Sequence, residues 1–358
     1  MSSESDTDFE ASVKTKREER FAEFDDDSKG FIGRLQHALH VTPALVPLIV
    51  LLVALVIFAF YLGERFFSPG TLTLILQQVQ IVGILAAAQT LIILTAGIDL
   101  SVGAIAVFSS VIMGQFTFRY GIPPSVAVVC GLAFGTACGA ASGYLVSRVK
   151  IPPFIATLGM WQIILAGNYL YSRNETIRSQ ELREEAPFLR FMGTVVEFGG
   201  ARVTYGVILM VVIIVVLAYM LRSTAWGRHV YAVGDDAESA QLAGVNVHRT
   251  LMSVYMMAGF ICALAGWVMI GRFGAVSPSA STGLEGNIQS ITAVVVGGIS
   301  LFGGRGSIWG AFFGALIVGV FELGLRMAGA NSQWTFLLIG ALIIGAVAVD
   351  QWIRKVSA

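Results

Sequence analysis

The chain has 358 residues, of which 56% are hydrophobic and 13% are charged, and its formal net charge is zero. The mean hydropathy is +0.76, and the charged fraction is far below the roughly 25% that is usual in soluble domains. This composition excludes a soluble multidomain protein and predicts an all-α integral membrane protein, with membrane lipid around it and no nucleic-acid partner.

Residue types that usually carry catalysis or cofactor binding are scarce and lack the spacing for it. The three cysteines, Cys130, Cys138 and Cys262, lie in apolar segments, so we expect neither a disulfide framework nor a metal site. No lysine follows the spacing of a P-loop, and no histidine lies in an H-E-x-x-H motif. We therefore expect no enzyme, no catalytic residue and no cofactor on this chain, and any ATP to be bound by another chain.

Residues 1–42 are expected to form a cytoplasmic N-terminal tail that is not cleaved. Residues 1–29 are polar with an acidic excess, and no apolar segment follows a basic start at the distance typical of a signal peptide. Phe31, Leu35 and Leu39 then recur at every fourth residue, which favours a short helix lying on the membrane surface.

Ten apolar segments follow and make up a predicted membrane domain over residues 43–352, ahead of a short C-terminal segment, 353–358. Their lengths suit a hydrocarbon core of roughly 30 Å. The eighth is the shortest and contains a Gly-Gly pair, so we expect it to be tilted or broken. The predicted spans are 43–63, 72–96, 100–118, 124–147, 154–172, 203–221, 251–271, 288–303, 307–327 and 334–352.

The distribution of basic residues predicts the orientation of these spans. An even number of spans places both termini on one side of the membrane. Since short cytoplasmic connections carry an excess of lysine and arginine, that side is predicted to be cytoplasmic, together with the connection 222–250, and the long connection 173–202 lies outside. The short connections that carry this signal contain Arg148, Lys150, Arg222, Arg228, Arg249 and Arg305.

An isolated carboxylate, Asp99, lies in the turn "GIDLS" between the second and third predicted spans, with Ser101 beside it. A carboxylate just before a helix can accept hydrogen bonds from backbone N–H groups and interact favourably with the helix dipole. A gating or coupling role is the alternative, because ionisable groups within a membrane protein often mark function. Few other carboxylates lie within the spans, which argues against a proton relay.

Amides and aromatic side chains recur at helical spacing in two spans. Gln78 and Gln89 are eleven residues apart, and Trp161 and Asn168 are seven apart, so each pair lies on nearly one helix face. Such groups would suit a pathway for a polyhydroxyl solute, because they form hydrogen bonds without charge. The alternative is structural, since amides also join membrane helices to one another.

A glycine-rich turn links the eighth and ninth predicted spans. Gly303 and Gly304 are expected to form a tight turn that presents Arg305, and the three residues are candidates for a gate. Gly310 and Gly314 then form a G-x-x-x-G face on the next span, which favours close helix packing.

The most unusual stretch is "GDDAESAQLAGVNV", residues 234–247, a polar segment between two apolar spans. Asp235 and Asp236 can cap a helix of about two turns over 237–243, and Gly244 supplies its C-terminal stop. A short rigid helix with a small-residue face is suited to docking in a groove of another protein. An ordinary solvated loop helix is the alternative.

Together with two further blocks, this segment resembles the permease subunits of bacterial ABC importers for monosaccharides, the ribose, xylose, arabinose, galactose and fructose group. The other blocks are "LTAGIDLSVGAI", residues 94–105, and "ITAVVVGGISLFGGRGSIWGAFFGALIVGV", residues 291–320. The likeness covers residues 45–352 and rests on the order and spacing of the three blocks.

The resemblance implies that the segment 234–247 is a coupling helix, which docks on the cytoplasmic ATP-binding subunit. The residues that this assigns to the coupling helix are Asp235, Asp236, Ala237, Glu238, Ser239, Ala240, Leu242, Gly244 and Asn246. Where the family usually has asparagine, proline, alanine and arginine, this chain has Asp236, Ala237, Ser239 and Gln241. The missing arginine argues against one salt bridge to the ATPase and not against docking.

The resemblance also implies the fold and the partners. It implies a ten-helix permease of the type shared with vitamin B12 and branched-chain amino-acid importers, working as a homodimer in the bacterial inner membrane. The implied partners are a cytoplasmic ATP-binding subunit, a periplasmic sugar-binding protein and a second copy of this chain.

Three other functions stay open from the sequence. A permease of the same fold could carry an autoinducer or a branched-chain amino acid. An ion-coupled sugar transporter would need carboxylates in the middle of its spans, which are scarce here. A passive channel would suit the glycine-rich spans.

Overall fold

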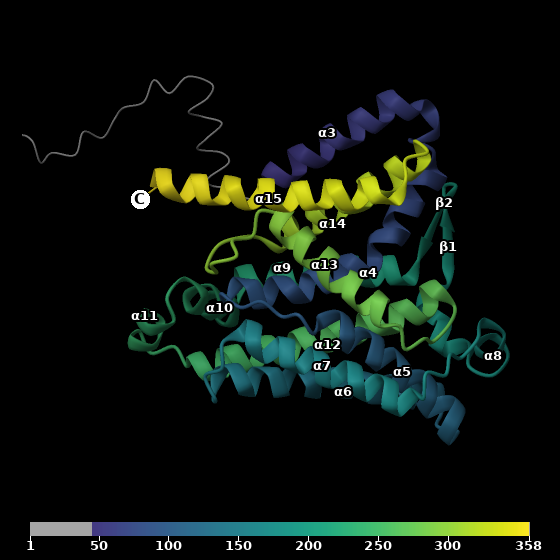
Figure 1. Ribbon diagram of the computed structural model, residues 1–358, viewed down its shortest axis with the longest axis horizontal. Helices are drawn as coiled ribbons and strands as arrows, with labels where there is room; N and C mark the ends of the chain where they lie inside the picture. The colour runs from purple at the N-terminus through teal and green to yellow at the C-terminus, as the bar shows by residue number, and fades with distance from the viewer. Residues whose placement is uncertain (1–44, 358) are drawn as a thin grey trace, which may run out of the picture. The chain divides into compact units, whose positions relative to one another are not determined.

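The computed structural model describes residues 45–357, so the predicted tail and surface helix within 1–42 lie outside the described residues (Figure 1). The helices and strands are α3 (Leu45–Leu62), η1 (Gly63–Arg65), α4 (Pro69–Leu94), α5 (Val102–Tyr120), α6 (Pro124–Ser147), α7 (Pro153–Ser172), α8 (Ser179–Glu184), η2 (Pro187–Gly193), β1 (Val195–Phe198), β2 (Ala201–Thr204), α9 (Tyr205–Ser223), α10 (Ala225–Asp235), α11 (Ala237–Leu242), α12 (Val247–Phe273), α13 (Ala280–Val296), α14 (Ile308–Met327) and α15 (Ser332–Ser357).

Each of the ten predicted spans overlaps a helix. Within the described residues, seven helices are long and apolar enough to cross a membrane, namely α3, extended by η1, α4, α5, α6, α9, α12 and α14. The helices α7, α13 and α15 occupy the other three predicted segments. The all-α membrane architecture is therefore confirmed, and the count of ten spans stays a prediction.

The prediction for the eighth span, 288–303, was wrong in its bounds. The helix α13 begins at Ala280, where the Ser279 side chain accepts a hydrogen bond from the Thr282 backbone nitrogen, and it ends at Val296 before Gly297 and Gly298. Gly298 adopts a φ of 75°, a left-handed conformation that glycine takes without strain and that stops a helix. The glycine pair therefore ends the span instead of lying within it.

The long connection 173–202 contains structure that the sequence did not predict. The helix α8 and the 3₁₀ helix η2 precede an antiparallel hairpin, in which β1 pairs with β2 from Val195 opposite Thr204 to Phe198 opposite Ala201. A second backbone pairing joins Ile177 to Val276, just after α12. This connection is thereby fixed to the bundle at several points.

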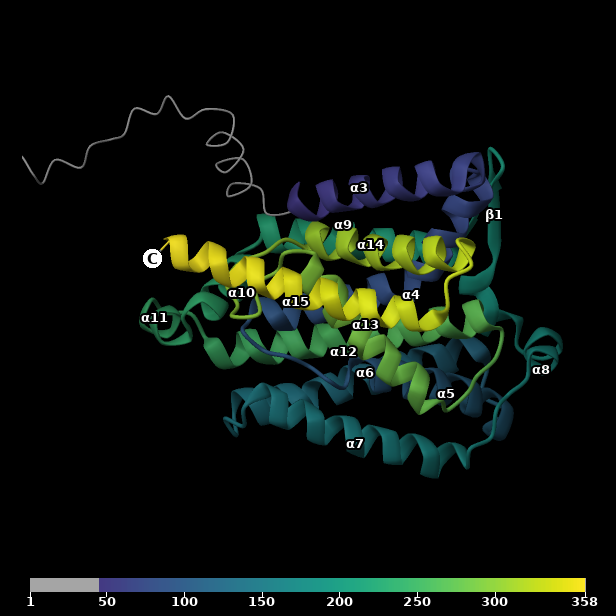
Figure 2. The same cartoon turned by 45° about the horizontal axis from the view of Figure 1, so that its top comes forward.

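The two ends of the bundle differ in character (Figures 1 and 2). We call the end that carries α11 the α11 end, and the opposite end, with α8, β1 and β2, the hairpin end. The described chain begins with α3 and finishes with α15 at the α11 end, which agrees with the predicted even number of spans.

The helices α4, α5 and α12 are the most buried of the long helices, and α3 is the least buried. In Figure 2, α3 and α7 lie at opposite edges with α4 and α12 between them. A Cβ atom on Gly314 would collide with the Ala293 carbonyl oxygen, and one on Gly310 with the Gly297 carbonyl oxygen. The predicted G-x-x-x-G face is thus confirmed as the surface on which α14 packs against α13.

Candidate functional site

The predicted coupling helix is present as α11, a short helix outside the bundle at the α11 end (Figure 1). Asp236 is its N-cap: Oδ1 accepts hydrogen bonds from the backbone nitrogens of Glu238 at 2.9 Å and Ser239 at 3.2 Å. Oδ2 accepts a further hydrogen bond from the Ser239 hydroxyl at 2.6 Å. Asp235, which was also predicted to cap, is instead the last residue of α10.

These hydrogen bonds lower the pKa of the Asp236 carboxyl below its ordinary value, and the bond from the Ser239 side chain contributes most. Each of them stabilises the charged form of the carboxyl. Asp236 therefore stays ionised at neutral pH, where a negative charge at a helix N-terminus is favourable.

The C-terminal end of α11 is also built as predicted. Gly244 has a φ of 88°, and its backbone nitrogen donates to the Gln241 carbonyl oxygen at 3.0 Å. Asn246 then caps the next helix, α12, by accepting a hydrogen bond from the Arg249 backbone nitrogen at 2.9 Å. The segment 234–247 is therefore fixed by three features: the N-cap of α11, its C-terminal glycine and the N-cap of α12.

The surface of α11 divides into two faces. One face is exposed and contains Ala237, Glu238 and Ser239. Leu242, an apolar residue at the end of α11, is also 85% exposed. Ala240, in contrast, is only 5% exposed. Ala240 lies in α11, as predicted, but its small side chain is turned toward the rest of the chain and is not on the exposed face of the helix.

The helix α10 connects α11 to the bundle through main-chain packing. A Cβ atom on Gly234 would collide with the Leu94 carbonyl oxygen and would lie 2.8 Å from the Gly304 nitrogen. The Gly304 nitrogen donates to that same Leu94 oxygen at 3.0 Å. We call this contact the glycine junction. It is formed by the end of α10 at Gly234 and Asp235, the end of α4 at Leu94 with Ala96 just after it, and the turn 303–306.

The predicted turn after the eighth span is thus part of the glycine junction. Gly303 and Gly304 have φ values of 83° and 69°, and a Cβ atom on Gly304 would lie 2.8 Å from the Asp235 Cα atom. The Tyr231 hydroxyl of α10 donates to the Gly306 carbonyl oxygen at 2.9 Å, while the Arg305 side chain is exposed. All three sequence blocks that carry the resemblance therefore meet at the α11 end.

The residues after α4 form a loop, 95–101, that turns back along α4. The Gln89 amide pairs with the backbone of Asp99. Its nitrogen donates to the Asp99 carbonyl oxygen at 3.1 Å, and its oxygen accepts from the Asp99 backbone nitrogen at 3.2 Å. The Thr157 hydroxyl of α7 donates to the Ile98 carbonyl oxygen at 3.0 Å. The loop is therefore held between α4 and α7.

Asp99 lies buried in this loop, and the prediction that it caps α5 was wrong. Its Oδ1 atom accepts hydrogen bonds from the Ser101 backbone nitrogen at 2.6 Å and the Ser101 hydroxyl at 2.5 Å. Ser101 is the N-cap residue of α5 but its side chain makes no capping bond. The carboxylate thus fixes the residue before the helix instead of the first turn.

The first turn of α5 is bonded by a residue that sequence reasoning missed. Asn287, in the middle of α13, accepts a hydrogen bond from the Gly103 backbone nitrogen at 2.6 Å and donates to the Leu100 carbonyl oxygen. A Cβ atom on Gly103 would lie 2.8 Å from the Asn287 Oδ1 atom, so glycine is needed for this approach. The sequence shows Asn287 only as an amide in the polar stretch "EGNIQS". It does not show that this amide is buried or which helix it faces.

The structure separates the two glutamines predicted to line a pathway. Gln89 pairs with the Asp99 backbone, whereas the Gln78 amide nitrogen donates to the Glu322 Oε1 atom at 2.8 Å near the hairpin end. Glu322 also forms an ion pair with Arg326 at 2.8 Å. Gln78 therefore joins two helices, as the structural alternative predicted, whereas Gln89 joins α4 to the loop that follows it.

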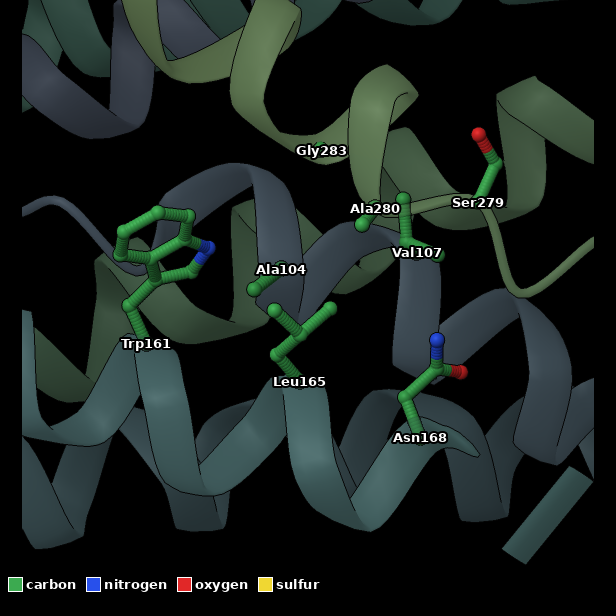
Figure 3. A pocket seen from close by; sticks show the side chains of 8 residues that line it. All are labelled: Ala104, Val107, Trp161, Leu165, Asn168, Ser279, Ala280 and Gly283. Carbon is green, nitrogen blue, oxygen red and sulfur yellow. The ribbon is translucent and has the colours of Figure 1, made fainter. Parts of the chain in front are cut away.

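Trp161 and Asn168 do lie on one face of α7, as predicted (Figure 3). They border a cavity of about 10 Å³, together with Ala104, Val107, Leu165, Ser279, Ala280 and Gly283. The Asn168 amide nitrogen donates to the Pro278 carbonyl oxygen at 3.2 Å, and its buried Oδ1 atom has no partner among the described residues. A cavity of this size holds at most one water molecule, so it is no pathway in this conformation.

A bundle with seven helices long and apolar enough to cross a membrane, among the described residues, is the architecture of a multi-pass membrane protein. Comparison with known proteins leads to the same class. Residues 71–347 match the family described as branched-chain amino acid transport system / permease component.

Individual relatives extend the comparison. The chain is 64% identical over 337 residues to the fructose import permease protein FrcC of Rhizobium meliloti, which covers 94% of this chain and 93% of the relative. It is 35% identical over 303 residues to the ribose import permease protein RbsC of Escherichia coli K12, with 85% and 92% covered. It is 30% identical over 306 residues to the D-allose transport system permease protein AlsC of that strain, with 86% and 91% covered. No solved structure matches the chain.

The chain belongs to the permease family of bacterial sugar ABC importers. This confirms the resemblance noted from the three sequence blocks. It also identifies the chain as a transport component and not an enzyme.

Proposed function

We propose that two copies of this chain form the pathway by which a monosaccharide enters the cell in an ATP-driven, binding-protein-dependent importer. The observation that carries the proposal is the rigid link from α11 to the spans: α11 is exposed, capped at both ends and joined through α10 to the glycine junction. A partner that moves α11 must therefore also move the end of α4 and the turn before α14.

In the proposed mechanism, the ATP-binding subunit receives Leu242 and the exposed residues of α11 in a groove. When two ATP-binding subunits close on ATP, α11 moves with them, and the displacement passes through Gly234 to Leu94 and Gly304. Packed backbone transmits such a shift because it cannot deform continuously. The equilibrium between the inward-open and outward-open states of the permease then shifts.

The substrate class rests on the relatives. The names of three relatives specify fructose, ribose and D-allose, all neutral polyhydroxyl solutes. Fructose is the first sugar to test because of the 64% identity. A branched-chain amino acid or an autoinducer is the alternative cargo within the same fold, and the name of the matching family supports testing the former. We expect the soluble binding protein to contribute most of the selection.

The proposed orientation puts the α11 end in the cytoplasm and the hairpin end in the periplasm of the bacterial inner membrane. The basic short connections at the α11 end support this orientation by the positive-inside rule. The charged connection 173–202, with its hairpin, is then the proposed docking surface for the periplasmic sugar-binding protein. Lipid surrounds the remaining apolar faces.

Reconstitution tests this function against its alternatives. The chain is co-expressed with candidate ATP-binding and sugar-binding partners, purified as a complex and placed in vesicles. We expect labelled fructose to accumulate only with ATP and the binding protein, and uptake to continue with a protonophore. Uptake without ATP, or uptake abolished by the protonophore alone, would contradict an ATP-driven importer and favour a channel or an ion-coupled transporter.

A further inference from the structure

A cleft at the hairpin end is separate from the small cavity beside Asn168 and from the glycine junction. It has a volume of about 230 Å³ and lies between the first turns of α13, the last turns of α14 and the first turns of α15. The residues that line it are Glu285, Gln289, Glu322, Arg326, Ala330, Thr335, Phe336 and Ile339. Because a single water molecule needs only about 10–15 Å³, the cleft has room for a solute with several polar groups.

The polar side chains of the cleft are held in place by one another. The Gln289 amide nitrogen donates to the Glu285 Oε1 atom at 3.0 Å across one turn of α13. On α14, the Glu322 Oε1 atom accepts hydrogen bonds from Gln78 and from Arg326, both at 2.8 Å. The Glu322 side chain is only 15% exposed, so the cleft contains a carboxylate that is oriented before any ligand arrives.

The composition of the cleft argues against the other ligands that it could meet. Charged side chains facing lipid tails are costly, so Glu285, Glu322 and Arg326 favour a cleft open to water. The carboxylates outnumber the guanidinium, which disfavours a phosphate or another anion. Arg326, bonded directly to Glu322, disfavours a bound cation. A neutral solute with many hydroxyl groups fits this mixture of donors and acceptors, because it needs both and carries no charge.

The cleft also offers an apolar contact. Phe336 is 68% exposed on the cleft side of α15, and aromatic rings present a large, rigid apolar surface at low cost in side-chain entropy. A pyranose or furanose ring has a C–H face that packs on such a surface while its hydroxyl groups reach the surrounding polar side chains.

We propose that this cleft is a low-affinity monosaccharide site at the outer mouth of the permease, with Gln289, Glu285 and Glu322 hydrogen-bonding the hydroxyl groups and Phe336 stacking on the ring. The inference rests on the proposed function, sugar import, and adds a site on the membrane subunit itself. The helix α13 links this site to the spans, since the same helix carries Asn287, which bonds the start of α5.

The test uses the full chain alone in lipid nanodiscs, without the binding protein or the ATP-binding subunit. Saturation-transfer-difference NMR with millimolar D-fructose should give signals from the ring protons in the unaltered chain. Phe336→Ala should weaken binding about five- to tenfold, as expected for the loss of one aromatic contact. Gln289→Ala should weaken it by a similar factor through the lost hydrogen bonds.

The matched control is Leu337→Ala, which removes an apolar side chain of 62% exposure at the neighbouring position of α15 that does not line the cleft. It should bind fructose as the unaltered chain does. Equal weakening by Leu337→Ala and Phe336→Ala would overturn the site, because it would mean that α15 as a whole was disturbed.

ATP-driven uptake by the complete complex, measured on the same variants, separates failure of the site from failure of the function. No NMR signal from the unaltered chain, together with normal fructose uptake, would overturn the cleft site and leave the importer in place. No uptake of fructose, ribose or allose by the complete complex would remove the proposed function, and the site with it. Reduced uptake at low sugar concentration in Phe336→Ala, with Leu337→Ala unchanged, would support both.

Discussion

The α11 end and the hairpin end use different parts of the chain for contact. At the α11 end, Gly234, Leu94 and Gly304 meet through backbone atoms, so there is no side chain to yield when one of them moves. At the hairpin end, the cleft between α13, α14 and α15 is lined by long polar and aromatic side chains. Side chains change rotamer on binding much more readily than packed backbone moves.

This difference suits the two proposed tasks. Transmission of a movement requires contacts that are either intact or broken, and close-packed backbone has that property. Recognition of a sugar requires donors and acceptors that adjust to the ligand and release it again. Adding an atom should therefore be most damaging at the α11 end, whereas removing one should be tolerated at the hairpin end.

The largest effect is expected from Gly234→Val. The added side chain would collide with the Leu94 carbonyl oxygen and crowd the Gly304 nitrogen, and neither backbone atom can turn away. We expect the free energy of unfolding to fall by about 3 kcal/mol or more, at the upper end of overpacking costs, and uptake to fall at least tenfold. Thermal unfolding in detergent and uptake per unit of membrane protein measure the two effects.

Two control variants test whether the damage at Gly234 is specific to the α11 end. Gly159→Ala adds a Cβ atom on α7 that meets no other part of the described chain within 4 Å, its own helix backbone aside, and it should leave uptake unchanged. Gln78→Ala removes the hydrogen bond to Glu322 at the hairpin end and should cost only about 1 kcal/mol. If Gln78→Ala were as damaging as Gly234→Val, the two ends would not differ in the way described.

The second prediction concerns Gly244→Val. Apart from its chain neighbours, no atom of the described residues lies within 4 Å of a Cβ atom at Gly244, so space is not limiting. The φ of 88° is nevertheless unfavourable for a residue with a side chain by roughly 1–2 kcal/mol. We expect α11 to lose its C-terminal stop, and ATP hydrolysis to continue while transport falls severalfold. Gly244→Asn, which tolerates this conformation better, should transport more than the valine variant, and equal, normal uptake in both would argue against a coupling role for α11.

Local rules made α11 predictable from the sequence. An aspartate just before a helix is an N-cap signal, which Asp236 fulfils, and Gly244 is a C-terminal stop. Both signals depend on neighbours in the chain, and both appear in the structure. The ten apolar segments were recognisable for the same reason. The bounds of α13 were not, because its hairpin-end turns contain "STGLEGN", which is polar and reads as a loop.

Contacts between distant segments were not predictable. Gly234 looks like the start of a polar loop, and only the fold brings it against Leu94 and Gly304. The cleft residues come from three helices, separated by stretches of the chain that carry no signal of their proximity. Asn287 likewise has partners set by packing, which is why the sequence did not show that it bonds the first turn of α5.

The third prediction separates the shape of the Asp236 cap from its charge. Asp236→Ala removes all three hydrogen bonds to Glu238 and Ser239, so α11 should fray, hydrogen exchange at those two amides should accelerate, and coupling should weaken. Asp236→Asn keeps an acceptor and should retain most of the uptake, since asparagine is as good an N-cap as aspartate. Rapid exchange in the asparagine variant too would mean that the charge, and not the cap, orders α11.

The lowered pKa of Asp236 sets the pH dependence of this cap. A carboxyl whose pKa is lower in the folded state stabilises the fold above its ordinary pKa of 3.8, and that contribution is lost as the pH falls through the lowered value. The protection of the Glu238 and Ser239 amides against hydrogen exchange should therefore stay constant from neutral pH down to about pH 5. It should fall only in stronger acid. Asp236→Asn should remove the acid-dependent loss.

The smallest effect is expected from Asp99→Asn. The asparagine Oδ1 atom can still accept the hydrogen bond from the Ser101 backbone nitrogen, so a carboxylate that only fixes the loop before α5 is replaceable, and uptake should stay within about twofold of normal. Asp99→Leu removes the acceptor and leaves buried Ser101 donors without one, at a cost of about 1–3 kcal/mol, so its membrane level should fall. Uptake normalised to membrane level by immunoblot distinguishes the cases. An asparagine variant that inserts normally but does not transport would assign the charge itself to gating, because its hydrogen-bond geometry would be preserved and only the ionisation lost.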